Sequence, residues 1–147
     1  MEVRKATAED LPAILRMARK FYAETSYAAL TPMSDDAVIG LARMIMDTGV
    51  LLVAEVQGDV VGMVALMVLP FMFNRDVRTA HEVAWWVDPD ERASGAGIAL
   101  MRALERACRA AGCRAIQMIA LPKSVPATAV YRRLGYVLSE YCWTKEL

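Results

Sequence analysis

The sequence predicts an α/β fold, in which helices flank a mixed sheet. Two observations support this prediction. Along the chain, the apolar residues alternate between segments with the period of a helix and segments with the period of a strand. The 147 residues have a length typical of one domain, and 56% of them are hydrophobic against 23% charged, which excludes a disordered chain. No linker, internal repeat or low-complexity tract divides the chain, so we expect residues 1–147 to form a single domain.

The N-terminal third predicts one strand followed by two helices. Residues 2–5 are a short strand candidate, and Thr7 is a suitable N-cap for the next element. Apolar residues then recur at helical spacing over residues 11–22. Ser34 is the N-cap of a second helix, and Gly49 is its stop.

The middle of the chain has the period of strands. Residues 50–56 and 60–69 predict a hairpin, with Gln57-Gly58-Asp59 as its tight turn. Residues 71–79 contain asparagine, aspartate and two arginines, and we expect an exposed loop there. Residues 80–87 form a further strand.

The C-terminal part resumes the helical period. Residues 98–111 carry an apolar stripe, and Gly112 closes this helix. A strand over residues 113–120 and a helix over residues 124–134 follow, and residues 136–145 close the chain as one bent strand or two short ones. The predicted order is therefore β-α-α-β-β-β-α-β-α-β, which is typical of an α/β or α+β sandwich around a mixed sheet.

Charge and composition exclude several classes of function. The 17 acidic and 17 basic residues cancel, so the chain lacks the basic surplus that general nucleic-acid binding requires. The longest apolar stretch, residues 60–73, is interrupted by Gly62 and Pro70 and is too short for a membrane span. The sequence therefore predicts a soluble protein that binds neither nucleic acid nor membrane.

The cysteines and the single histidine give no sign of a metal site. Cys108, Cys113 and Cys142 are odd in number and irregularly spaced, which argues against a disulfide framework and for a reducing, cytoplasmic location. No histidine or cysteine cluster has the spacing of metal ligands, so we predict no metal.

The segment Arg92-Ala93-Ser94-Gly95-Ala96-Gly97 lies between a strand and a strongly amphipathic helix. Unpaired N–H groups and the dipole at a helix N-terminus favour phosphate, and glycine lets a bulky anion approach the main chain. Arg92 adds a charged donor and Ser94 a hydroxyl. A P-loop is excluded because Ile98, not lysine, follows Gly97, and a dinucleotide fingerprint is excluded because Leu100 occupies the position of its third small residue.

The chain resembles the GNAT superfamily of N-acetyltransferases. Residues 92–97 match its phosphate signature, Arg/Gln-x-x-Gly-x-Gly/Ala, and the preceding Val-Asp-Pro-Asp-Glu at residues 87–91 is similar to the family. Residues 127–136, Ala-Thr-Ala-Val-Tyr-Arg-Arg-Leu-Gly-Tyr, are similar to its second motif. The resemblance covers essentially the whole chain and implies a GNAT-like fold, a mixed, mostly antiparallel sheet flanked by about four helices.

The resemblance also implies a cosubstrate, acetyl-CoA, and a place for it. The pyrophosphate would lie on the phosphate segment, and the pantetheine arm would lie along the main chain at the end of the fourth strand. Ala93 stands where the family often has glycine, and Ser124 stands where many members have an asparagine that contacts the cosubstrate arm. The residues so implied are Trp86, Val87, Arg92, Ala93, Ser94, Gly95, Ala96, Gly97 and Ser124.

Two residues are candidates for the chemistry. Tyr131 matches the family tyrosine assigned as general acid, and a phenol with an ordinary pKa of ~10 is protonated at neutral pH and can donate to a thiolate. Glu82 is the candidate base, and regular alternation would place it on the same face of its strand as Ala84 and Trp86. Successive Trp85 and Trp86 must face opposite ways.

The predicted function is transfer of an acetyl group from acetyl-CoA to a primary amine by direct attack, which makes the protein an N-acetyltransferase. The acceptor stays open among polyamines, aminoglycoside-like amines, amino acids and protein amines, and we expect residues 25–33 and 71–79 to select it. Two alternatives stay open: a non-catalytic acyl-CoA-binding sensor on the same fold, and an interaction domain that binds no nucleotide. The C-terminal strands expected at the surface suggest a homodimer.

Overall fold

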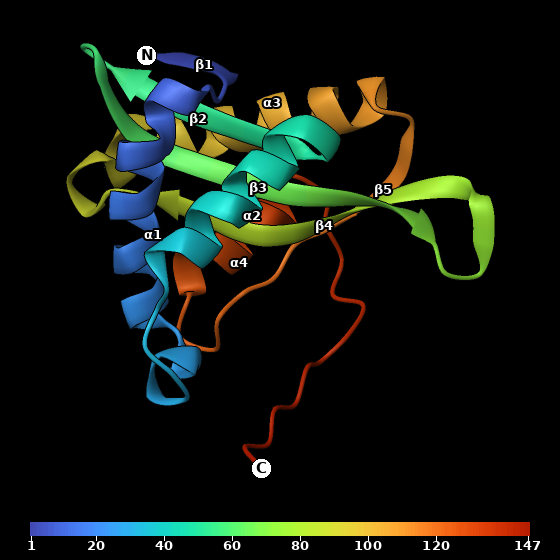
Figure 1. Cartoon of the computed structure of the whole chain (residues 1–147). Helices are drawn as coiled ribbons and strands as arrows, with labels where there is room; N and C mark the ends of the chain where they lie inside the picture. Colours follow the sequence, from blue (N-terminus) through green and yellow to red (C-terminus); the bar gives the residue numbers. More distant parts are fainter.

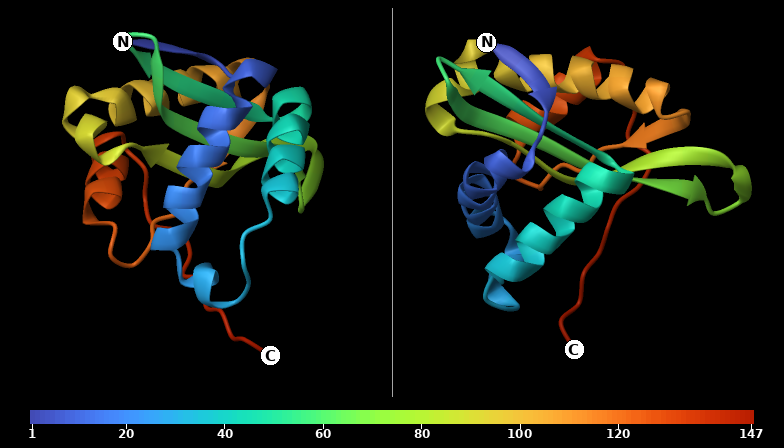
Figure 2. Two further views of the ribbon diagram at one scale, coloured as in Figure 1. Left: turned by 60° about the vertical axis from the view of Figure 1, so that its left-hand side comes forward. Right: turned by 45° about the horizontal axis from the view of Figure 1, so that its top comes forward.

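The structure, a computed structural model of residues 1–147, is a five-stranded sheet with helices on both faces (Figure 1). The strands lie in chain order, with β1 to β4 antiparallel and β5 parallel to β4. Helices α1 and α2 cover one face, and α3 and α4 cover the other (Figures 1 and 2). The α-helices and strands are β1 (Glu2–Lys5), α1 (Leu11–Glu24), α2 (Asp35–Thr48), β2 (Val50–Val56), β3 (Asp59–Phe71), β4 (Asn74–Val87), α3 (Ala96–Ala110), β5 (Cys113–Gln117) and α4 (Val125–Arg133). Short 3₁₀ helices lie at η1 (Ala8–Asp10), η2 (Ser26–Ala29) and η3 (Pro89–Ser94).

This architecture confirms the predicted class, an α/β fold around a mixed, mostly antiparallel sheet. The helix signals also lie where they were expected. Ser34 caps α2 by accepting a hydrogen bond from the Ala37 N–H at 3.3 Å, and Gly49 follows its last residue. Gly112 and Gly135 end the later helices with positive φ angles of 77° and 85°, which glycine tolerates best.

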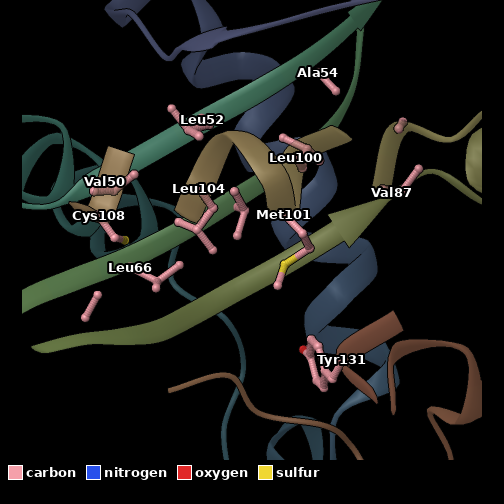
Figure 3. Packing of buried hydrophobic residues seen from close by; sticks show 13 residues of the cluster. Val50, Leu52, Ala54, Leu66, Val87, Leu100, Met101, Leu104, Cys108 and Tyr131 are labelled. Carbon is pink, nitrogen blue, oxygen red and sulfur yellow. The ribbon is translucent and has the colours of Figure 1, made fainter. Parts of the chain in front are cut away.

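Two hydrophobic cores fill the space on the two sides of the sheet. The core beneath α3 and α4 contains 13 buried residues, drawn as sticks in Figure 3. The core beneath α1 and α2 contains 11. Gly49 marks the close approach of α2 to the sheet, because a Cβ at this position would lie 2.3 Å from the carbonyl oxygen of Leu66.

Three expectations about strands are wrong or incomplete. Residues 71–79 do not form a loop: β3 runs to Phe71 and β4 starts at Asn74, so a long hairpin projects beyond the sheet (Figure 1). The polar composition of this segment suggested a loop, but most of its residues pair with β3 and so belong to the strand. Strand β5 ends at Gln117 and not at residue 120. Residues 136–145 form no strand, because no other segment of the chain pairs with them.

None of the helices combines the length and the apolar character that crossing a lipid bilayer requires.

Candidate active site

Strands β4 and β5 diverge, which leaves one edge of β4 open. Their parallel pairing ends where His81 faces Gln117. Beyond this point β4 continues to Val87 with no strand on that side. An unpaired strand edge offers N–H and C=O groups to an extended ligand, which could add to the sheet as a further strand.

The register shows which residues offer these groups. The Asp88 N–H donates to the Val61 carbonyl of β3 at 2.8 Å. Because backbone groups of successive residues point alternately to the two edges of a strand, those of Trp86 point to β3, and those of Trp85 and Val87 point into the gap. Of the two residues predicted to bind through their main chain, only Val87 points its backbone groups into the gap in this register, and its carbonyl accepts from the Arg92 side chain. Trp85, which the sequence reasoning did not select as a ligand-binding residue, points its backbone groups into the gap as well.

Glu82 lies where the gap begins and is hydrogen bonded to two other segments. Its carboxylate accepts from the Ile119 N–H at 2.6 Å and from the Tyr131 hydroxyl at 3.3 Å. The same hydroxyl is 2.8 Å from the Ile119 carbonyl oxygen. Tyr131 projects from α4 and is buried (Figure 3). The structure thus brings together the two residues predicted to carry the chemistry, although 49 positions separate them in the chain.

The surroundings shift the pKa values of both groups upward. Burial raises the pKa of the Glu82 carboxyl to about 7, although the hydrogen bonds from Ile119 and Tyr131 oppose this shift. Burial and the neighbouring Glu82 charge raise the pKa of the Tyr131 phenol well above its usual range. At neutral pH, Glu82 can therefore both accept and release a proton, while Tyr131 remains protonated.

A β-bulge in β4 determines the face on which Glu82 lies. On β3, the consecutive residues Ala65 and Leu66 pair with Ala84 and Glu82, so Val83 is an extra residue between them. The extra residue interrupts the alternation of side chains. The expectation that Glu82 shares a face with Ala84 is therefore wrong: Ala84 lies in the core beneath α1 and α2, whereas Glu82 contacts α4.

The two tryptophans of β4 face opposite sides of the sheet, as predicted. The Trp85 ring packs against Tyr131, with 5.4 Å between the ring centroids. The Trp86 ring packs edge-on against Phe21 of α1, with a centroid distance of 6.4 Å. Trp86 thus belongs to the face opposite Glu82, contrary to the expectation from regular alternation.

The predicted phosphate segment connects η3 to α3. Gly95 has a φ of +87°, and a Cβ built on it would meet no atom within 4 Å, so the space above its main chain is open. The first N–H groups of α3 have no acceptor within the helix and could hold an anion. The Ser94 hydroxyl is already used inside the loop, since it donates to the Glu91 carbonyl at 2.7 Å and accepts from the Ala96 N–H at 3.3 Å.

The other small residues of this segment have different surroundings. A Cβ at Gly97 would lie 3.3 Å from the Trp85 ring, so glycine here allows α3 to pack on that tryptophan. The Ala96 side chain is fully buried in the core beneath α3, whereas Ala93 is exposed. The small residues of this segment thus have two roles: Ala96 and Gly97 allow α3 to pack closely, and Gly95 leaves its main chain open.

Arg92 folds back onto the end of β4. Its Nε donates to the Val87 carbonyl at 3.1 Å, and its guanidinium lies 4.9 Å from the centre of the Trp86 ring. A terminal nitrogen is 3.6 Å from the Glu24 carboxylate of α1. The side chain is about half exposed, so it is positioned to exchange these contacts for a phosphate.

Ser124 is the N-cap residue of α4, and its hydroxyl makes no hydrogen bond within the chain. The side-chain donors of Arg92 and Ser94 are used within the chain, whereas the hydroxyl of Ser124 is free to bind a ligand.

Sequence reasoning missed two residues that organise the site. Ile119 uses its main chain to bond both Glu82 and Tyr131, and no sequence signal reveals such a contact. The Asp88 carboxylate accepts from Arg16 at 2.6 Å, from Lys20 at 2.7 Å and from the Trp86 indole at 3.2 Å. It thereby ties α1 to the end of β4, and its place in the Val-Asp-Pro-Asp-Glu motif is a signal that could have found it.

The diverging strands, the segment of residues 92–97 and the paired carboxyl and phenol are the features that the resemblance to acyl-CoA-dependent transferases predicts. The comparisons identify the family. The family model described as "Acetyltransferase (GNAT) family" matches residues 11–136. The chain therefore belongs to the GNAT acetyltransferase family.

Solved structures share the fold over nearly the whole chain. An acetyltransferase of Trypanosoma brucei is 27% identical, with 99% of each chain covered and a TM-score of 0.73. The aminoglycoside N-acetyltransferase AAC(6')-Iy, in complex with the bisubstrate analogue CoA-S-monomethyl-acetylneamine, is 16% identical, with 99% of this chain and 97% of that chain covered and a TM-score of 0.79. A ribosomal-protein-alanine N-acetyltransferase from Brucella melitensis is 16% identical, with 100% of each chain covered and a TM-score of 0.78.

Proposed function

We propose that this protein transfers an acetyl group from acetyl-CoA to a primary amine by direct attack, with Glu82 as base and Tyr131 as acid. The observation that carries the proposal is the contact of these two side chains at 3.3 Å, at the point where β4 loses its neighbour. Residues 1–147 act as one domain in this proposal. Family membership supports acyl transfer in general, and the pair of titratable groups supports an amine as the acceptor.

The residues at the gap fit the parts of acetyl-CoA. The open main chain at Gly95 and the N-terminus of α3 would hold the pyrophosphate, with Arg92 as a charged donor. The free edge of β4, at Trp85 and Val87, would bind the amide groups of the pantetheine arm as a neighbouring strand would. The free hydroxyl of Ser124 would bind the arm from the other side.

The chemistry follows from the protonation states of the two groups. Ionised Glu82 takes a proton from the incoming ammonium, and the freed amine attacks the thioester carbonyl, so that a C–N bond forms. In this proposal, the N–H groups of Trp85 and Val87, which point into the gap, would stabilise the negative charge that the carbonyl oxygen gains. As the C–S bond breaks, Tyr131 gives its proton to the leaving sulfur, and the nitrogen, which still carries one proton more than the amide product, releases that proton to solvent. Because Glu82 and Tyr131 are in hydrogen-bond contact, the proton taken from the ammonium can then restore the phenol.

The acceptor is not specified beyond a primary amine. The similar structures act on different acceptors by their names, an aminoglycoside in one case and a ribosomal-protein alanine in another. In this chain the segment between α1 and α2 is ordered by the Tyr22 hydroxyl, which donates to the carbonyls of Tyr27 and Thr31 at 2.8 and 2.6 Å. We infer that this segment contributes to acceptor choice. The other expected segment lies along the projecting hairpin, and its exposed tip is about 30 Å of strand away from Glu82.

The test is the release of coenzyme A from acetyl-CoA over a panel of amines, with Tyr131→Phe as the diagnostic variant. We expect kcat to fall by roughly 10²-fold or more, because general acid catalysis is worth at least that factor, while the affinity for acetyl-CoA changes little. Tyr141→Phe, at an exposed tyrosine, is the matched control and should keep full activity.

Two results would contradict the proposal in different ways. Binding of acetyl-CoA by calorimetry without turnover of any amine would favour the non-catalytic acyl-CoA sensor. No binding of coenzyme A at all would favour an interaction domain that uses the fold without its cosubstrate.

A further inference from the structure

The basic side chains are concentrated in one part of the fold. Residues 92–135, from the phosphate segment to the end of α4, contain eight arginine and lysine residues and a single acidic residue, Glu105. The rest of the chain contains nine basic and 16 acidic residues, since the whole chain has 17 of each kind. The expectation that the chain binds no nucleic acid rested on its net charge of zero. That net charge conceals a strongly basic region and an acidic remainder.

The outer side of α3 lies in this basic region. The helix exposes four side chains, three of them arginines and one an alanine, and its other side chains are buried or half-buried: Arg102, Arg106, Arg109 and Ala110 are the exposed ones. The arginines are four and three residues apart, so they form one stripe that extends ~10 Å along the helix axis. No other element covers this side of α3 (Figure 2). We call Arg102, Arg106 and Arg109 the arginine stripe.

Most of these charges have no partner within the chain. Arg102 and Arg106 form no ion pair, and neither does Arg114, which follows the helix and lines the same cavity as Arg109. Arg109 lies 3.7 Å from the Glu105 carboxylate one turn earlier, an exposed arrangement that contributes little to stability. Folding therefore gains little from the stripe, and its guanidinium groups are free to contact an external anion.

The residues of α3 indicate which kind of anion fits. Membrane-binding helices carry large apolar side chains beside their cations, and none of the large exposed apolar residues of the chain lies on α3. Single-stranded nucleic acid binds by stacking its bases on aromatic side chains, and α3 contains no aromatic residue. Duplex DNA requires neither feature, because its phosphates present one negative charge per ~1.7 Å of helix axis and bind arginine without base contacts.

The stripe is separate from the proposed cosubstrate site. Arg106 and Arg109 lie ~15 and ~20 Å along the helix from the N-terminus of α3, where the pyrophosphate would bind. Arg92, whose side chain folds onto the end of β4, belongs to that site and not to the stripe. A ligand on the stripe can therefore bind while the cosubstrate site is occupied.

We propose that the arginine stripe, together with Arg114, binds the phosphate backbone of duplex DNA without reading its sequence. Each guanidinium donates hydrogen bonds to phosphate oxygens and releases condensed cations from the DNA, so the affinity falls as the salt concentration rises. Four such contacts give a slope of about −3.6 for the logarithm of the association constant against the logarithm of the salt concentration. Arginine has no acceptor for a 2′-hydroxyl, so duplex RNA gains no additional contact.

The test is the fluorescence anisotropy of a labelled DNA duplex of about 20 base pairs, titrated with the protein between about 50 and 200 mM salt. We expect a dissociation constant of roughly 1–100 μM near physiological salt, with the slope given above. The variant in which all three stripe arginines are changed to glutamine should bind about tenfold more weakly or worse at low salt, with a slope near about −1.

Arg43→Gln is the matched control, because Arg43 is an exposed arginine without an ion pair on α2, which covers the opposite face of the sheet. We expect this variant to bind DNA as the wild type does. Far-UV circular dichroism checks that each variant keeps its fold.

Several results would overturn the proposal. Absence of DNA binding at low salt would refute it directly, and equal binding by the wild type and the triple variant would move the DNA to another surface. Displacement of the DNA by saturating coenzyme A would assign the phosphates to residues 92–97. Tighter binding to duplex RNA, or to vesicles containing phosphatidylserine, would assign the stripe to that partner instead. None of these readouts measures acetyl transfer, so the proposed function stands or fails separately.

Discussion

The raised pKa of Glu82 predicts that the protein loses stability as the pH rises through neutrality. The pKa of this carboxyl is about 7 in the folded chain against an ordinary value of 4.5, because burial penalises its charge. The folded chain therefore holds this proton more tightly than the unfolded chain does. The stability that this proton contributes is fully present below about pH 4.5 and is lost as the pH rises to about 7.

The magnitude follows from the two pKa values. Each pKa unit of difference corresponds to ~1.4 kcal/mol, so the free energy of unfolding should fall by roughly 2.5 kcal/mol between pH 5 and pH 8 through this group alone. Glu82→Gln removes the ionisation and keeps the shape of the side chain. Its amide can still accept the hydrogen bond from Ile119. The variant should be close to the wild type in stability at pH 5 and more stable by roughly 2.5 kcal/mol at pH 8.

The assay is urea unfolding of the wild type and of Glu82→Gln at a series of pH values, followed by tryptophan fluorescence. Glu9→Gln, at an exposed carboxylate, is the matched control and should retain the wild-type pH dependence. Activity gives a second readout. If ionised Glu82 is the base, kcat/KM of the wild type should rise through pH ~7, and this rise should disappear in Glu82→Gln.

If the free energy of unfolding changed equally with pH in the wild type and in Glu82→Gln, the assignment of a raised pKa to Glu82 would be refuted. It would mean that the carboxyl is solvated in the folded protein and titrates at its ordinary value. A rise of kcat/KM that persists in Glu82→Gln would assign the base to another group while leaving the stability argument intact.

Three further substitutions test the framework around the site. Gly49→Ala should lower the free energy of unfolding by about 3 kcal/mol, as measured by urea unfolding, because its Cβ would meet the Leu66 carbonyl oxygen at 2.3 Å; wild-type stability would contradict the close approach of α2. Asp88→Ala should cost about 2 kcal/mol in the same measurement, since it removes the acceptor of two hydrogen bonds from α1 and of one from the Trp86 indole; an unchanged midpoint would mean that the contacts are loose in solution. Gly95→Ala forces a side chain into a φ of +87° and should cost ~1 kcal/mol. Calorimetry should show acetyl-CoA binding about tenfold weaker in this variant, and unaltered affinity would argue against a phosphate at this turn.

The sequence predicted well those parts of the fold that depend on local signals. Helical spacing of apolar residues and the caps at Ser34, Gly112 and Gly135 placed all four α-helices, because these signals act within a few residues. The tight turn at Gln57-Gly58-Asp59 placed the first hairpin for the same reason.

The errors concern contacts between distant segments. The composition of residues 71–79 suggested a loop, but pairing with β3 extends β4 through most of this segment. Residues 136–145 have the composition of a strand, and within one copy no segment pairs with them. A strand needs a neighbour, and the choice of neighbour is a property of the whole fold.

In the candidate site too, the features that depend on local sequence could be predicted, and those that depend on contacts between distant segments could not. The phosphate segment and Tyr131 could be found because each belongs to a continuous motif. Glu82 could be selected, but its face could not, because the register of β3 against β4 introduces the bulge at Val83. The free main-chain groups of Trp85 and the contacts of Ile119 likewise depend on register and not on side-chain type.

The extra residue at Val83 also allows two residues that are two positions apart to serve opposite faces of the sheet. On β3, Ala65 and Leu66 are successive and face opposite sides, and their partners Ala84 and Glu82 face the same sides as they do. Deleting Val83 would make Glu82 and Ala84 successive, which regular alternation also places on opposite faces, so Glu82 would keep the face of Tyr131 and the strand would lose only the local bend of the bulge. The contact between Glu82 and Tyr131 therefore depends on the pairing of Glu82 with Leu66 and not on the side chain at residue 83.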